Sequence, residues 1–120
     1  MSREARLQRV AGWAIVLIAF IHLAVTFIDY DTPSLRALWF VGSGFALLLI
    51  GGLNLVSAQL NDDALRDVRG VRVLTLVADG CGIVLGLGYV WLTGGTQPQG
   101  PVLVALFFAA AGAQLARRVR

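Results

Sequence analysis

Long apolar stretches separated by short polar connections make up most of the chain. At ~1.5 Å rise per residue, roughly twenty helical residues cross the hydrocarbon core of a bilayer. Three stretches reach that length, and the fourth borrows length from the arginines after it, whose side chains can extend to lipid headgroups. The apolar stretches are 10–28, 35–58, 71–93 and 101–116, and the helix of the last one is expected to extend to residue 118. They predict an all-α membrane protein, a four-transmembrane-helix bundle that forms a single domain over residues 1–120.

The connections between these stretches differ in charge. Residues 29–34 contain two acids and residues 94–100 contain no charged residue, and both have the composition typical of turns. In the longer connection, Asn61 or Asp62 is placed to cap the third helix, and Asp62 lies one helical turn before Arg66, a spacing that favours an ion pair. We therefore expect the third helix to begin before it enters the bilayer.

Arginines mark one side of the predicted bundle. The N-terminal flank, the middle connection with Arg72, and the C-terminal tail contain three arginines each, while the other two connections share only Arg36. Short arginine-rich flanks stay in the cytoplasm, so both termini are expected there. Trp39, Tyr89 and Trp91 then fall near the outer interface, as aromatic belts require. The expected location is the bacterial inner (cytoplasmic) membrane, with multi-pass topology.

Composition narrows the classes of function. Hydrophobic residues make up 58% of the chain, and the formal net charge is +3. A basic soluble protein would suggest nucleic-acid binding, but here the arginines follow membrane topology, so no nucleic-acid partner is expected. Cys81 is the only cysteine, which excludes an internal disulfide. One cysteine with one histidine gives no zinc site within a single chain.

Asp79 lies inside the third apolar stretch, where a carboxylate costs about 2.5 to 3.5 kcal/mol on insertion scales. We expect its helix face to point into the bundle, because that face collects polar and small residues at helical spacing: Arg72, Thr75, Asp79, Gly82, Gly86, Tyr89 and Thr93. Helix rise places Asn54 roughly 8 Å and Asp79 roughly 12 Å from the cytoplasmic edge, which favours Asn54 as a partner. Asp79 is then a proton carrier, an ion ligand, an anchor for a cationic or hydroxylated ligand, or a structural hydrogen-bonding group.

His22 is the only histidine and lies on a second stripe of small and polar residues, in the first apolar stretch. It falls roughly 18 Å from the cytoplasmic edge, so a water or a ligand could connect it to Asp79 across roughly 6 Å of depth. A functional interpretation makes His22 a proton relay or an axial haem ligand. A structural interpretation makes it a neutral imidazole that forms hydrogen bonds within the bundle, and the sequence leaves both open.

Small residues recur on the third and fourth predicted helices. Gly82 and Gly86 form a GxxxG motif, which lets two transmembrane backbones approach closely. The fourth stretch has a comparable small face made of Ala105, Ala109, Gly112 and Ala116. These faces favour either tight packing within one chain or a homo-oligomer, a dimer or a trimer.

Two sequence patterns resemble those of known membrane proteins. Gly12 and Trp13 with His22, followed by Trp39 and Phe40 before two glycines, resemble a GW...H and WF...G pattern of uncharacterised small bacterial four-helix integral membrane proteins. That resemblance covers the first half of the chain and implies the four-helix topology without an activity.

The second pattern is Asp79 and Gly80 with Tyr89 beyond them, which looks like the third-helix DG...Y segment of membrane styrene oxide isomerases, small four-helix haem enzymes. This resemblance covers about a dozen residues and implies an isomerase acting with haem. The haem histidine of that family belongs to the second helix, where this chain has none, and the spacing from aspartate to tyrosine differs.

The leading functional hypothesis is a membrane-embedded binding or accessory protein that holds a small lipophilic ligand or a partner helix in a buried polar site around Asp79 and His22. One alternative is an isomerase-type enzyme acting on a lipophilic substrate, with Asp79 and Tyr89 as acid and base and with haem as the candidate cofactor. Another is a small proton-coupled transporter. The candidates for ligand binding or proton relay are Asp79, His22, Asn54, Thr75 and Tyr89, and the expected partners are the lipid bilayer and further copies of the chain.

Overall fold

The computed structural model describes residues 1–60, 64 and 67–117, and these residues contain four long helices. The helices are α1 (Arg3–Asp29), α2 (Leu35–Gln59), α4 (Arg69–Leu92) and α5 (Gln99–Ala116). All four are long and apolar enough to cross a membrane. The predicted all-helical fold with four membrane-length helices is confirmed.

Some predictions concern parts of the chain that the structure does not describe. The helix cap at Asn61 or Asp62, the pair of Asp62 with Arg66, and the arginines at positions 118 and 120 lie outside the described residues.

The start of α1 differs most from its predicted bounds. The apolar stretch begins at Val10, whereas the helix begins at Arg3, because Ser2 caps it by accepting a hydrogen bond from the N–H of Ala5 at 3.1 Å. Hydropathy marks the part of a helix that lies in the bilayer, so it misses polar turns that extend beyond the bilayer. Ser34 caps α2 in the same way, with its Oγ 3.1 Å from the N of Ala37.

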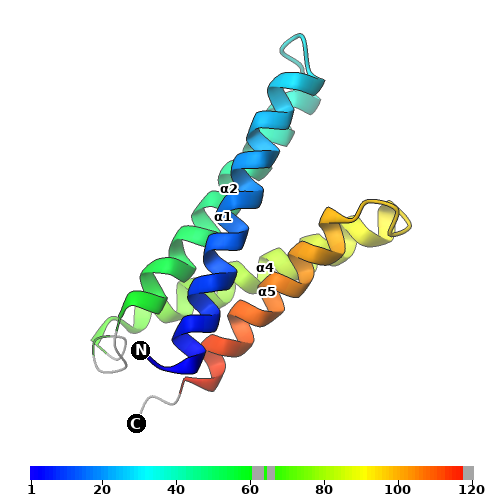
Figure 1. Cartoon of the computed structure of the whole chain (residues 1–120). Helices are drawn as coiled ribbons and strands as arrows, with labels where there is room; N and C mark the ends of the chain where they lie inside the picture. The colour runs from blue at the N-terminus through cyan, green and yellow to red at the C-terminus, as the bar shows by residue number, and fades with distance from the viewer. Residues whose placement is uncertain (61–63, 65–66, 118–120) are drawn as a thin grey trace.

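The helices form two antiparallel hairpins, which Figure 1 shows as the arms of a V. Hairpin 1 is α1 with α2, and hairpin 2 is α4 with α5. The hairpins meet at the end where α1 and α4 begin and α2 and α5 end, which we call the closed end. They diverge toward the two turns, at the open end. The turn of hairpin 2 contains Gly94 and Gly95 at φ values of 60° and 72°, a left-handed conformation that glycine adopts without strain.

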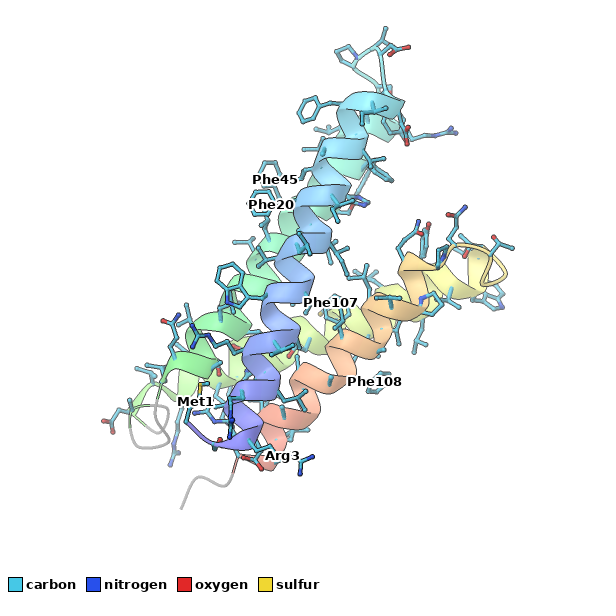
Figure 2. The ribbon with its side chains drawn as sticks, in the orientation of Figure 1. Met1, Arg3, Phe20, Phe45, Phe107 and Phe108 are labelled. Atoms are coloured by element: carbon cyan, nitrogen blue, oxygen red, sulfur yellow. The ribbon has the colours of Figure 1, made fainter. Side chains whose placement is uncertain are left out.

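The interior of the bundle is rich in polar side chains and its surface is apolar, which is the opposite of a soluble protein. Gln8, Gln114, Asn54, Thr75 and Asp79 are polar side chains with no exposed surface, and Ile15 and Phe107 are the large apolar side chains buried with them among the described residues. Large apolar side chains instead cover the outside, and in Figure 2 Phe20 and Phe45 project from the outer side of hairpin 1. A surface of this kind is suited to lipid and not to water.

Glycines bring α1 and α2 into close contact. A Cβ added to Gly51 would lie 2.7 Å from Val16 Cγ2 and 3.0 Å from the carbonyl oxygen of Gly12. Closer to the open end, a Cβ on Gly44 would lie 2.6 Å from Leu23 Cδ2. The absence of a side chain at these positions fixes how α1 and α2 are aligned, and thereby which polar residues face each other.

Candidate functional site

The candidate site lies where the two hairpins meet, and it centres on Asp79 of α4. Asn54 Nδ2 of α2 donates a hydrogen bond to Asp79 Oδ1 at 2.7 Å, and both side chains are fully buried. The partner favoured by the helix-depth argument is therefore the one observed. Because this bond joins α2 to α4, it links hairpin 1 to hairpin 2 in the bundle interior.

Asn54 also connects Asp79 to α1. Gln8 Nε2 donates to Asn54 Oδ1 at 3.0 Å, and Asn54 Nδ2 makes a second bond to the carbonyl of Ile50 at 3.2 Å. Every polar atom of the Asn54 side chain is thus in use. Gln8 is as deeply buried as Asn54, with no exposed surface.

Arg117 joins the end of α5 to the same network. Its Nη1 donates to the carbonyl of Ser57 at 2.7 Å and to Gln8 Oε1 at 3.4 Å, and its Nη2 donates to the carbonyl of Leu60 at 2.6 Å. Only 4% of the residue is exposed. The expected extension of Arg117 to the headgroups is therefore wrong. The physical reason is that the last carbonyls of α2 lack partners within their helix and attract a cationic donor.

A second set of bonds links α5 to α2 and α4. Gln114 Nε2 donates to Ser57 Oγ at 3.3 Å and to the carbonyl of Arg72 at 3.2 Å. Thr75 lies on α4 between Arg72 and Asp79, is fully buried, and donates to the carbonyl of Val71 at 2.7 Å. Thr75 therefore belongs to the polar interior but uses its hydroxyl proton within its own helix.

Two buried oxygen atoms in this region have no hydrogen-bond partner among the described residues: Asp79 Oδ2 and Gln114 Oε1. Both are acceptors. A buried acceptor without a donor is costly, about 1 to 3 kcal/mol, and it marks a place where a donor from outside the chain would be favourable.

His22 lies far from Asp79. Its Nε2 is 2.8 Å from Ser43 Oγ and 3.1 Å from the carbonyl oxygen of Phe40, and its ring stacks on the Phe40 ring with centroids 3.8 Å apart. In the antiparallel alignment of α1 and α2, Gln8 faces Asn54 and His22 faces Ser43, which places His22 about 16 Å or more along the hairpin from Asn54. The expected difference of roughly 6 Å is smaller than this separation, because each depth was counted from the end of its own apolar stretch, whereas the structure aligns Gln8, which precedes the first stretch, with Asn54 inside the second.

Tyr89 lies toward the open end of α4, about 15 Å along the helix from Asp79. It is 40% exposed, and its hydroxyl oxygen accepts a hydrogen bond from Gln99 Nε2 at 3.2 Å. The structure therefore brings together Asp79 and Asn54, with Thr75 in the same layer, and places His22 and Tyr89 elsewhere.

Some residues that form hydrogen bonds around Asp79 were not among the site residues predicted from the sequence, although the sequence pattern indicates that they face the interior. Gln8 continues the polar and small stripe of the first stretch backwards at helical spacing, through Gly12. Ser57 lies three residues after Asn54, and Gln114 is the one polar side chain within residues 101–116. Arg117 gave no signal of its own, because a terminal arginine beside a membrane is ordinarily solvated.

Chemically, this arrangement is an acceptor site enclosed by amide groups. The described residues include no cluster of three His, Cys, Asp or Glu side chains that could hold a metal ion. Between Arg117 and Asp79 the hydrogen bonds pass through the carboxamides of Gln8 and Asn54, which donate and accept hydrogen bonds but do not titrate. This arrangement positions the carboxyl group and offers no obvious route for proton hopping.

Comparison of the chain with models of protein families, with curated proteins and with solved structures gave no match.

Proposed function

We propose that the protein is an integral membrane protein of the bacterial inner membrane that binds a small lipophilic ligand, or a helix of a partner protein, at Asp79. The observation that carries the proposal is the buried, unpartnered Oδ2 of Asp79 at the junction of the two hairpins. An acceptor in that position favours a ligand that donates a hydrogen bond, such as a hydroxyl or an ammonium group attached to an apolar body.

The shape of the molecule supports access to Asp79 from the bilayer. The hairpins diverge toward the open end, as Figure 1 shows. Among the described residues, each side-chain hydrogen bond between the hairpins lies at Asp79 or closer to the closed end. Opening the junction from the membrane side therefore breaks few polar contacts.

The distribution of arginine supports the proposed orientation, with both termini in the cytoplasm. Among the described arginines, Arg36 lies at the open end. The other six belong to segments at the closed end: Arg3, Arg6, Arg9, Arg69, Arg72 and Arg117. By the positive-inside rule, the closed end faces the cytoplasm.

The rival functions require side chains that are distant from Asp79. An isomerase-type enzyme would use Tyr89 as a second acid-base group or His22 as a haem ligand, and both lie well away along their helices. A proton-coupled transporter would need a relay from Asp79, and the adjacent groups are the amides of Asn54 and Gln8. Ligand binding at Asp79 requires no second acid-base group, no haem ligand and no proton relay.

The test compares the full chain with Asp79→Asn after gentle extraction in native lipid, using native mass spectrometry and an absorbance spectrum. The asparagine retains an oxygen to accept from Asn54 but replaces the free acceptor with a donor. We expect the wild type to retain a defined ligand mass and Asp79→Asn to retain at least about tenfold less, the equivalent of one charge-assisted hydrogen bond.

Thr93→Val is the control, because it changes a polar side chain of the same predicted face near the open end, away from Asp79. A wild type extracted without any ligand, or equal ligand retention in Asp79→Asn, would contradict the proposal. A Soret band in the absorbance spectrum would favour the haem enzyme instead.

A further inference from the structure

The two buried acceptors without a partner, Asp79 Oδ2 and Gln114 Oε1, lie at nearly the same level of the bundle. Their bonded neighbours on α2 fix that level, since Asp79 is bonded to Asn54 and Gln114 is bonded to Ser57. Ser57 follows Asn54 by three residues, which corresponds to about 4.5 Å along a helix. The two acceptors therefore belong to one layer of the interior.

The alignment of α4 and α5 makes the two side chains converge. Gly82 of α4 faces the ring of Phe107 of α5. In an antiparallel pair, this contact places the buried Ala110 opposite Asp79, and it places Gln114 about one turn closer to the closed end. Side chains tilt toward the beginning of their own helix, so Asp79 points toward the closed end and Gln114 toward the open end.

The orientation of the Gln114 amide follows from its neighbours. Its nitrogen lies 3.2 Å from the carbonyl oxygen of Arg72, and a carbonyl can only accept a hydrogen bond. The amino group must therefore face Arg72, and the oxygen must take the remaining position of the amide. Gln114 Oε1 is for this reason an acceptor, as Asp79 Oδ2 is.

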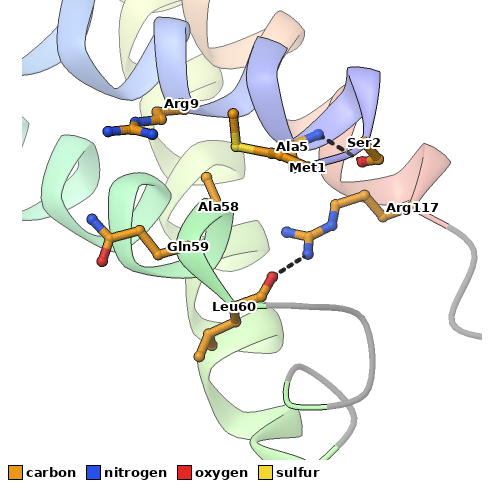
Figure 3. A pocket seen from close by; sticks show the side chains of 8 residues that line it. All are labelled: Met1, Ser2, Ala5, Arg9, Ala58, Gln59, Leu60 and Arg117. Carbon is orange, nitrogen blue, oxygen red and sulfur yellow. Dashed lines mark hydrogen bonds between the residues drawn. The ribbon is translucent and has the colours of Figure 1, made fainter.

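The carboxyl group of Asp79 has no cation in contact with it among the described residues, since its one hydrogen-bond partner is the uncharged Asn54. Arg117, the buried cation of the same network, donates instead to Gln8 and to the end of α2, as Figure 3 shows for the carbonyl of Leu60. A buried carboxylate without a counter-charge is costly. A positively charged donor is therefore the most favourable group at this place.

The number of acceptors distinguishes an amine from an alcohol. A hydroxyl group has one proton and can serve only one of the two oxygens, whereas a protonated primary or secondary amine has at least two N–H donors. Charge-assisted N–H···O bonds of about 2.7 to 2.9 Å let one nitrogen bridge oxygens roughly 4.5 to 5 Å apart. That span is similar to the difference in level between Asn54 and Ser57.

We propose that the ligand is an amphiphilic amine whose protonated amino group donates one hydrogen bond to Asp79 Oδ2 and a second to Gln114 Oε1. This inference rests on the proposed binding of a ligand at Asp79 and specifies its chemical class. It also assigns Gln114 of α5 as a second ligand-binding residue.

The experiment titrates the full chain in maltoside micelles with dodecylamine and with its N-methyl, N,N-dimethyl and N,N,N-trimethyl derivatives, and reads occupancy by native mass spectrometry. All of these amines are positively charged at neutral pH, but successive methyl groups lower the number of N–H donors from three to none. Dodecanol is the uncharged probe of the same chain length.

We expect the wild type to bind dodecylamine and its N-methyl derivative about equally, because both have a donor for each acceptor. Affinity should fall about tenfold at the N,N-dimethyl derivative, which has one donor, and again at the trimethyl derivative. Dodecanol should bind at least about tenfold more weakly than dodecylamine.

Gln114→Met keeps the length of the side chain and removes its acceptor. In this variant the first loss of affinity should move to the trimethyl derivative, because Asp79 then needs only one donor. A change confined to packing would weaken all probes alike. Gln99→Met, the same substitution at an exposed position of hairpin 2, should behave like the wild type. The wild-type series tests the proposal even if Gln114→Met does not fold.

Two results would overturn the bridging amine while leaving a ligand site at Asp79. These are wild-type affinity that first falls at the trimethyl derivative, and dodecanol that binds as tightly as dodecylamine, provided that Asp79→Asn weakens binding in each case. If Asp79→Asn instead binds every probe as the wild type does, the proposed function fails together with this inference.

Discussion

Asn54 links three helices through one carboxamide group. Its oxygen accepts from Gln8 on α1 and its nitrogen donates to Asp79 on α4. Because Gln8, Asn54 and Asp79 are fully buried, each of these groups would be unsatisfied if the others were absent. The polar residues at this level therefore depend on one another, and removing the central one affects all of them.

We predict that Asn54→Leu lowers the free energy of unfolding by about 1 to 3 kcal/mol, because Asp79 Oδ1 and Gln8 Nε2 lose their buried partner. The measurement is unfolding in mixed micelles titrated with sodium dodecyl sulfate and followed by circular dichroism. Gln99→Leu, at an exposed position of hairpin 2, should unfold like the wild type. Unchanged stability of Asn54→Leu would mean that the network contributes nothing to folding.

His22 presents a separate case at the residue scale, because it bridges only α1 and α2. Replacing it with leucine removes its bonds to Ser43 and to the Phe40 carbonyl and the stacking on the Phe40 ring. We predict a loss of about 1 to 2 kcal/mol in unfolding free energy and unchanged ligand retention at Asp79. Loss of the ligand without loss of stability would instead place His22 in the binding site.

At the scale of the helices, the GxxxG motif of α4 is filled by large side chains of α5. A Cβ on Gly82 would lie 2.8 Å from the Phe107 ring, and a Cβ on Gly86 would lie 2.7 Å from Val104 Cγ2. Figure 2 shows Phe107 between the hairpins. The motif thus packs within one chain, which was one of the two interpretations that the sequence left open.

We predict that Gly82→Ala destabilises the protein by about 1 to 3 kcal/mol, because the Phe107 ring must move. Gly80→Ala is the matched control on the same helix, since a Cβ there meets nothing within 4 Å, and the gain in helix propensity should leave its stability equal or higher. Phe107→Leu should recover part of the loss in the Gly82→Ala background. Equal unfolding of the two alanine variants would contradict the predicted clash.

The small face of α5 remains available for contact with a second copy. Ala105, Gly112 and Ala116 are exposed, and a Cβ on Gly112 meets nothing within 4 Å. We propose a homo-oligomer through this face, and we predict that Gly112→Leu weakens it while leaving the unfolding of the monomer unchanged. Chemical crosslinking in native membranes measures the difference, and a wild type that yields only monomer would exclude the oligomer.

At the scale of the whole molecule, polar contacts are concentrated at the closed end. Among the described residues, side-chain hydrogen bonds link the hairpins from Asn54 to Asp79, from Gln114 to Ser57, and from Arg117 to Ser57, Leu60 and Gln8. Toward the open end, the hydrogen bonds of His22 and Tyr89 remain within one hairpin. The two arms are thus fixed relative to each other at one end.

We predict that distances between the hairpins vary more at the open end than at the closed end. Spin labels in a Cys81→Ser background, at positions 32 and 96 for the open end and at 59 and 116 for the closed end, would measure this by double electron-electron resonance. The open-end pair should give a broad distance distribution that narrows when the ligand is retained. Distributions of equal width would indicate a rigid junction and remove the proposed route to Asp79.

Arg117 and His22 illustrate which parts of the site could be predicted from the sequence and which could not. Asp79 and its partner Asn54 could be anticipated, because a buried carboxyl group needs a donor at a similar depth. The inward fold of Arg117 depends on where the end of α2 lies relative to the end of α5, which no local pattern encodes. The distance of His22 from Asp79 depends on the alignment of two antiparallel helices, which the contact between Gly12 and Gly51 fixes.

By itself the sequence determined the four helices and the inward position of Thr75, Asp79 and Gly82 on α4, because apolar length, capping residues and helical spacing act over one or two turns of chain. Only the tertiary structure decided that the hairpins join at one end and diverge at the other, and which polar residues meet at the junction. That outcome depends on close packing between segments far apart in the chain, where a shift of one helical turn would pair different residues.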